Sequence, residues 1–209
     1  MVAQSRKEGP LSPKIGVAPL RREQIVRATI RCLAREGYSG LTMKKVSRQA
    51  GVSQGILHYY FADKRAILVA ALETVMTDLD RRVAAAQARS GRDPRARLRA
   101  LVRASLEAAV EAREVWVVFV EFWGEMMHDA RLRAINADLY TRMRRLIGAL
   151  LTQGVRAGRF RRVDPVPAAA VVLGLLDGVA LQLTFDPRAF GVAAAARFCE
   201  DALARYLAR

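Results

Sequence analysis

One short stretch, AGVSQGILHYYFADK at residues 50–64, carries side chains suited to binding nucleic acid. Ser53 and Gln54 begin its helical part, and a glutamine amide can pair with the edge of an adenine base. Gly55 has no side chain, so a helix backbone can approach the bases closely there. Lys64 adds a positive charge that favours phosphate oxygens. The types and spacing of these groups predict contact with DNA.

Aromatic residues follow one helical turn later in the same stretch. Tyr59 and Tyr60 each combine an apolar ring with a hydroxyl group, so both can pack against a groove wall and bond phosphate oxygens. Phe61 has no polar group, and we expect it to fill the core between the third and fourth helices. His58 leaves alternatives open: it contacts a base edge or a phosphate, or it is an ordinary surface histidine.

The elements that must position these side chains are helices. Apolar residues recur at three- and four-residue spacing over 21–36, which predicts a first helix. Thr42 is placed to cap a second helix that ends at Ala50, and Ser53 is placed to cap a third. Asp63 begins a long fourth helix. Two short helices joined by a tight turn and braced by a longer one form a helix-turn-helix, whose second helix enters the major groove.

The rest of the chain is also helical by pattern. Apolar spacing predicts helices at 95–112, 114–128 and 131–157, and no alternating run of β-branched residues indicates a strand. Three Asp-Pro pairs predict further helix starts near residues 94, 166 and 187. The predicted fold class is therefore all-α, with about nine helices.

Residues 42–68, TMKKVSRQAGVSQGILHYYFADKRAIL, resemble the DNA-binding signature of the TetR family of transcriptional regulators, and the resemblance covers about residues 20 to 68. It implies a homodimer with three DNA-binding helices per subunit and a helical C-terminal domain that binds an effector. Many members carry tyrosine where this chain has His58. Carried over position by position, the DNA contacts fall on Thr42, Lys44, Ser53, Gln54, Gly55, His58, Tyr59, Tyr60 and Lys64.

This resemblance divides the chain into three parts. Residues 1–19, with several prolines, are expected to form a flexible basic arm, residues 20–66 the helix-turn-helix domain, and residues 67–209 the effector-binding and dimerisation domain. Apolar helices at 166–184 and 188–207 would meet their twofold mates as a four-helix bundle. The small residues that would permit close approach there are Ala168, Ala169, Ala170 and Gly174.

The segment VWVVFVEFWGEMMHD at residues 115–129 is apolar almost all round its helix, which is typical of a buried helix. With the later GLLDGVALQL it resembles the choline-sensing betaine repressor branch of the TetR family. Aromatic rings can hold a cationic ligand against an acidic counter-charge; alternatively, the rings are core and the glutamates are solvated. The candidate ligand-binding residues are Trp116, Phe119, Glu121, Trp123, Glu125 and Asp177.

Charge and composition limit the partners. The net charge is +15 and the sequence pI is about 11.0, and the first 65 residues hold 13 Lys and Arg against 4 Asp and Glu. The electrostatic field of so strongly positive a protein attracts nucleic acid or an anionic membrane. The apolar run at 165–185 carries Asp177 at its centre, which disfavours a membrane span. Cys32 and Cys199 are far apart and are expected to be buried free thiols in the cytoplasm.

Catalysis is not expected. The chain has two histidines, His58 and His128. It lacks a glycine-rich phosphate loop, a nucleophile elbow, and any set of carboxylates and histidines at the spacing of metal ligands. No cofactor or metal is predicted. The sequence therefore predicts a ligand-responsive regulator, a repressor by the default of the family, released from a palindromic operator when a small molecule shifts the fourth helix. The alternative is a ligand-independent or architectural DNA-binding protein with the same helix-turn-helix.

Overall fold

The computed structural model describes residues 14–111 and 113–208, without the side chains of 14–17, 114, 115, 118, 121, 122 and 125. Nine α-helices make up this part of the chain, and it contains no strand. The all-α prediction is confirmed. The helices are α1 Lys14–Gly40, α2 Met43–Ala50, α3 Gln54–Tyr60, α4 Lys64–Arg89, α5 Pro94–Glu111, α6 Arg113–His128, α7 Ala130–Arg156, α8 Pro165–Phe185 and α9 Val192–Tyr206.

The predicted helix caps are present. The Thr42 hydroxyl accepts a hydrogen bond from the Lys45 amide, and the Ser53 and Asp63 side chains cap α3 and α4 in the same way. Between α2 and α3, Gly51 has φ of 64°, a left-handed conformation that glycine adopts without strain. The Gln24 amide of α1 donates to the Ala50 carbonyl at 2.6 Å. Local capping and this brace together fix the angle between α2 and α3.

Two expected helix starts are wrong. The first helix begins at Lys14 rather than near 21, so residues 14–19, expected in the arm, are helical; the rest of that arm, residues 1–13, lies outside the described residues. The pair Asp186-Pro187 begins only a turn, in which the Ala189 amide bonds the Asp186 carbonyl at 3.2 Å. The last helix, α9, begins five residues later, after Gly191.

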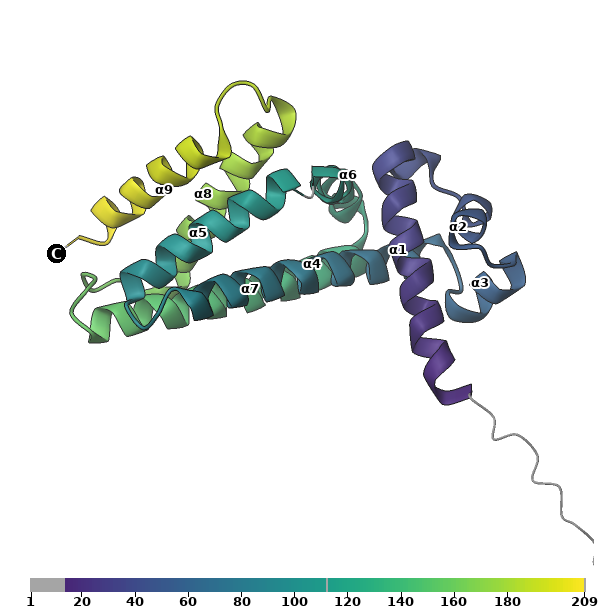
Figure 1. Cartoon of the computed structure of the whole chain (residues 1–209), viewed down its shortest axis with the longest axis horizontal. Helices are drawn as coiled ribbons and strands as arrows, with labels where there is room; N and C mark the ends of the chain where they lie inside the picture. Colours follow the sequence, from purple (N-terminus) through teal and green to yellow (C-terminus); the bar gives the residue numbers. More distant parts are fainter. Residues whose placement is uncertain (1–13, 112, 209) are drawn as a thin grey trace, which may run out of the picture.

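The helices form two hydrophobic cores. The N-terminal core joins α1–α3 to the first half of α4, α6 and the start of α7, whereas the C-terminal core lies among α5, α7, α8 and α9. Figure 1 shows α1–α3 at one end of an elongated molecule, with α4 leading away from them toward the other end. Along its length α4 packs mainly against α5. Trp116, Tyr140 and Met143 pack against both cores. The long helix α4 also contributes to both cores, with its first half in the N-terminal core and Val83 in the C-terminal core.

By length and composition, α8 is the one helix of the described chain that could span a membrane. Its inner face belongs to the C-terminal core, and that face includes Ala168 and Ala169, which are 2% and 0% exposed. The expectation that these two alanines face a second subunit is therefore wrong. Ala170 and Gly174, by contrast, lie on the exposed side of α8.

Candidate functional site

The helix-turn-helix presents an exposed, polar face along α3. Gln54, Gly55 and His58 are all exposed, and Tyr59 is 83% exposed. Leu57 points the other way and is completely buried in the N-terminal core. Because α3 is short and anchored by one leucine, its outer face is free to enter a groove while its inner face fixes the position of the helix.

Gly55 has no structural requirement within this chain. A Cβ atom at that position would meet only the Ser53 hydroxyl oxygen, at 3.9 Å. Glycine inside a helix lowers stability by about 0.5–1 kcal/mol relative to alanine. The fold therefore does not require glycine at this position, and the predicted close approach of α3 to DNA remains a prediction that would account for it.

The other predicted DNA-contact residues differ in what they already bind. Thr42 and Ser53 are exposed, but each hydroxyl also accepts a capping hydrogen bond. Lys44 is exposed at the start of α2. Tyr60 is half-buried and packs edge-on to Tyr59, with ring centroids 5.1 Å apart. Phe61 is 3% exposed in the N-terminal core, as expected for a residue with no polar group.

Lys64 has an intramolecular role that the sequence did not reveal. Its ammonium donates to the Tyr38 carbonyl at 2.7 Å and lies 4.2 Å from the centre of the Tyr38 ring. A cation over an aromatic face is attracted by the ring quadrupole. Lys64 therefore ties the start of α4 to the end of α1, directly behind the DNA-facing helices.

A cavity of about 230 Å³, here called the C-terminal cavity, lies between α4, α5, α6, α7 and α8. Trp116 and Met143 contribute to its largely apolar wall. Asp177 lines it from the middle of α8, and Asp80 lies at its exposed rim on α4 beside Arg142. Two carboxylates against one guanidinium leave the charged part of the lining with an excess of one negative charge.

Asp177 is the distinctive polar group of this cavity. Its carboxylate accepts a hydrogen bond from the Tyr140 hydroxyl at 2.7 Å. Burial raises the pKa of Asp177, and the Tyr140 hydrogen bond only partly offsets this shift. Partial burial raises the pKa of Asp80 as well, against the opposing charge of Arg142. The ionised form of Asp177 is thus poorly solvated, whereas Asp80 remains exposed to solvent at the rim.

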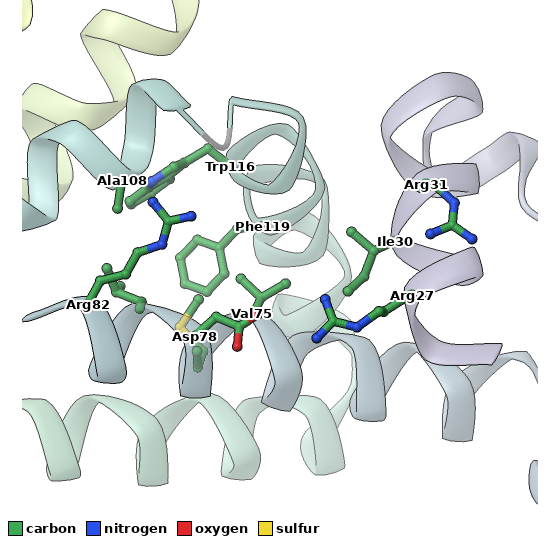
Figure 2. Close-up of a pocket in the computed structure, with 11 residues that line it drawn as sticks. Arg27, Ile30, Arg31, Val75, Asp78, Arg82, Ala108, Trp116 and Phe119 are labelled. Carbon is green, nitrogen blue, oxygen red and sulfur yellow. The ribbon is translucent and has the colours of Figure 1, made fainter. Parts of the chain in front are cut away.

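The predicted ligand-binding residues gather only in part: Trp116 packs edge-on to Phe119, with ring centroids 5.4 Å apart, but Asp177 does not line the cavity of Phe119. Trp116 and Asp177 line the C-terminal cavity, but Phe119 faces a second cavity beside α1 (Figure 2). Trp123 stacks edge-on against Phe119, with ring centroids 5.3 Å apart, and packs into the N-terminal core. The side chains of Glu121 and Glu125 lie outside the described residues.

Sequence reasoning missed three residues of the C-terminal cavity: Asp80, Tyr140 and Arg142. Asp177 was detectable because a charge stands alone in an apolar helix. Asp80 and Arg142, by contrast, belong to runs of charged residues on α4 and α7 and resemble ordinary solvated positions. They come to the same cavity only because the folded chain brings α4, α7 and α8 together around it.

Residues 25–71 match the family model of the bacterial regulatory proteins of the TetR family, and residues 94–208 match that of the C-terminal domain of BetI-type transcriptional repressors. The HTH-type transcriptional regulator BetI of Burkholderia ambifaria is 34% identical over 175 residues, covering 81% of this chain and 85% of the relative. BetI of Paraburkholderia phytofirmans is 32% identical over 189 residues, covering 90% and 94%.

Solved structures resemble the chain over almost its whole length. A transcriptional regulator from Pseudomonas aeruginosa PAO1 superposes with a TM-score of 0.79 at 26% identity, covering 90% of this chain and 91% of the other. A regulator from Saccharomonospora viridis, solved in complex with choline, superposes with a TM-score of 0.74 at 27% identity, covering 88% and 95%.

Proposed function

The chain belongs to the TetR family of transcriptional regulators, with a BetI-type C-terminal domain, and from this premise we propose that it represses transcription until a small organic cation binds the C-terminal cavity. The proposal rests on one observation above all. Asp177 stands inside an apolar cavity, with a tyrosine as its hydrogen-bond donor and an indole in the same wall.

The chemistry of the cavity favours a quaternary ammonium compound. Such a cation has an apolar surface that suits the lining, while its charge would neutralise the excess negative charge of Asp80, Asp177 and Arg142. A desolvated cation over an indole gains about 2 kcal/mol or more, and Trp116 provides that ring. The choline complex of the S. viridis regulator supports this class of ligand.

Replacing Asp177 by asparagine is expected to weaken choline binding by about 10- to 100-fold, because it removes a poorly solvated charge from the ligand site. Titration calorimetry with choline measures this loss. Asp138→Asn, an exposed position of α7 outside the cavity lining, serves as the matched control and should leave the affinity unchanged. Equal affinity in wild type and Asp177→Asn would place the cation elsewhere.

Choline affinity should also depend on pH. Burial raises the pKa of Asp177, so acidification protonates it earlier than an exposed aspartate, and only the ionised carboxylate attracts a cation. Affinity is therefore expected to rise as the pH increases through the raised pKa, with release of protons on binding. In Asp177→Asn the dependence should be shallower, leaving the part that Asp80 contributes. A steeper dependence in the variant contradicts this assignment.

The route from ligand to DNA runs through α4. This helix lines the C-terminal cavity with Leu79, Asp80 and Val83, and its first residue, Lys64, is tied to the end of α1. A ligand that displaces α4 would therefore turn α3 with it. The ligand can weaken operator binding by no more than the ratio of its affinities for the displaced and the undisplaced arrangement of α4.

The operator is proposed to be palindromic, because a twofold dimer presents two α3 helices to successive major grooves, about 34 Å apart. The proposed division of labour is residues 20–66 for DNA and 67–209 for effector and dimer. Exposed apolar side chains on α8 and α9, among them Phe185 and Phe198, support dimerisation through those helices. A regulator bound to DNA in this way acts in the bacterial cytoplasm.

Two substitutions test the division between base and phosphate contacts on this surface. Gln54→Ala is expected to relax base preference at one position of each half-site by about 1–3 kcal/mol, since it removes a bidentate base contact. Lys44→Ala should weaken all sequences alike and lower the salt slope by about one unit per subunit. Anisotropy titrations against fragments selected from the genome, at several salt concentrations, separate these outcomes. A sequence-selective loss in Lys44→Ala would overturn the division.

The alternative, an architectural DNA-binding protein with no ligand, predicts a different result. A protein of that kind should melt at the same temperature with and without choline or any other small cation. The C-terminal cavity and the poorly solvated carboxyl group of Asp177 favour the sensor. Operator release measured beside thermal shift decides between the two functions.

A further inference from the structure

The second cavity, here called the junction cavity, lies where the DNA-binding end meets the C-terminal end. It has a volume of about 260 Å³ and is lined by residues of α1, α4, α5 and α6 (Figure 2). Trp116 and Leu79 belong to the walls of both cavities. A molecule in the junction cavity would therefore touch α1, the brace of the helix-turn-helix, and α4 at the same time.

The charges around the junction cavity are opposite to those of the C-terminal cavity. Three guanidinium groups line it, those of Arg27, Arg31 and Arg82, against the single carboxylate of Asp78. Asp78 is itself paired with Arg81 at 2.9 Å, so its charge is already partly neutralised. With their ion-pair partners Glu23, Arg81 and Glu111 included, the charged groups of the lining keep an excess of one positive charge.

The guanidinium groups retain capacity to bind an anion. Arg27 pairs with Glu23 at 2.8 Å and Arg82 with Glu111 at 2.7 Å, and in both pairs each side chain is at least half exposed. Exposed pairs of this kind contribute only about 0–1 kcal/mol. A guanidinium also carries five N–H donors, so one carboxylate partner leaves others to share.

The floor of the junction cavity is apolar. Phe119 is 5% exposed, and Val75, Met76 and Ile30 surround it. Figure 2 shows the Phe119 ring with Arg82 on one side and Arg27 on the other, Arg27 extending from α1 toward α4. A ligand with an apolar body and a negative charge would match both the apolar floor around Phe119 and the arginines at the rim of the cavity.

We propose that the junction cavity binds an amphipathic organic anion, a carboxylate carried on an apolar chain or ring. The apolar body packs on Phe119, and the carboxylate is attracted by the guanidinium groups of Arg27 and Arg82, which lie on opposite sides of that ring. A cation is repelled by the same arginines, and a neutral apolar molecule leaves the charged rim unused. This second effector site is separate from the cation site in its charged groups, since neither Asp177 nor Asp80 lines it, but the two cavities share Trp116 and Leu79.

Such an anion would link the two ends of the molecule. Arg27 belongs to α1 and Val75 to α4, so an anion whose carboxylate is attracted by Arg27 while its apolar body packs near Val75 restrains how α1 is set against α4. Operator affinity then changes by no more than the ratio of the anion's affinities for the two arrangements of α1 and α4. Because Trp116 walls both cavities, the anion is also expected to alter choline affinity, and choline must alter anion affinity by the same factor.

The test compares three probes with the same eight-carbon chain: octanoate, octylamine and octanol. Calorimetric titration of the full-length protein is expected to show saturable octanoate binding at least about 10-fold tighter than that of octanol or octylamine. Arg27→Gln and Arg82→Gln should each weaken octanoate by about 10-fold. Arg89→Gln removes the same charge from an exposed position of α4 outside this cavity and should leave octanoate binding unchanged.

Three outcomes would overturn the proposal. Equal binding of the three probes means that the site takes apolar chains regardless of charge, and absence of octanoate binding means that no anion site exists. Equal weakening by Arg89→Gln assigns the effect to the overall positive field. Thermal melting and choline titration of each variant establish that the fold is intact, and they keep this result separate from failure of the cation site.

Discussion

Replacing Phe198 by glutamate is expected to convert the dimer into monomers and to weaken operator binding by about 10²–10⁴-fold. Phe198 on α9 is 75% exposed, and Phe185 at the end of α8 is 71% exposed. Exposed aromatic side chains of this size on adjacent helices mark a surface that is covered by a partner. A buried, unpaired carboxylate at such a surface is strongly unfavourable.

The expected loss of DNA binding follows from geometry rather than from any contact of Phe198 with DNA. In a dimer, the second α3 helix binds its half-site at a high effective concentration once the first has bound; a monomer loses this advantage. Sedimentation measures the association state, and anisotropy measures operator affinity. Phe198→Leu keeps the side chain apolar and should remain dimeric. A dimeric Phe198→Glu protein would rule out α9 as part of the interface.

Replacing Gly154 by alanine is expected to destabilise the fold, although glycine to alanine within a helix is usually stabilising. A Cβ atom at this position of α7 would come within 1.9–2.8 Å of three Phe160 ring atoms. Phe160 is 3% exposed in the C-terminal core, and the amides of Arg159 and Phe160 both bond the Gly154 carbonyl. The ring cannot move aside without emptying its place in that core.

The balance for Gly154→Ala is set by two effects of opposite sign. Overpacking a filled site costs about 1–3 kcal/mol or more, while the gain in helix propensity is about 0.5–1 kcal/mol. Each kcal/mol of net loss lowers Tm by about 2–4 °C in a protein of this size. Gly124→Ala is the control, because nothing lies within 4 Å of a Cβ there. A Gly154→Ala protein as stable as that control would show that the loop after α7 yields freely.

Local capping chemistry made much of the fold predictable. The side chains of Thr42, Ser53 and Asp63 each accept a hydrogen bond from the amide three residues ahead, so their effect depends on the neighbouring sequence alone. Asp186 also bonds a nearby amide, that of Arg188, yet only a turn follows. A cap signal therefore locates where a helical turn begins, but packing decides whether that turn continues.

The cavities were much less predictable than the DNA-facing helix. Gln54, Gly55 and His58 lie within five residues of one helix, so a linear pattern keeps them together. Asp80 and Asp177 lie on helices far apart in the sequence, and no periodicity relates them. The charge that a cavity presents arises from packing between helices, which explains why the sequence did not predict the three arginines that line the cavity of Phe119.

The shared use of α4 by the two cores bears on the construction of hybrid regulators. Ile67, Leu68 and Met76 of α4 belong to the N-terminal core, whereas Val83 belongs to the C-terminal core. If the DNA-binding head were exchanged at residue 66, the foreign α1–α3 would have to pack against the native first half of α4, which belongs to the N-terminal core. A functional chimera should keep the first half of α4 with the head and place the junction between Met76 and Val83.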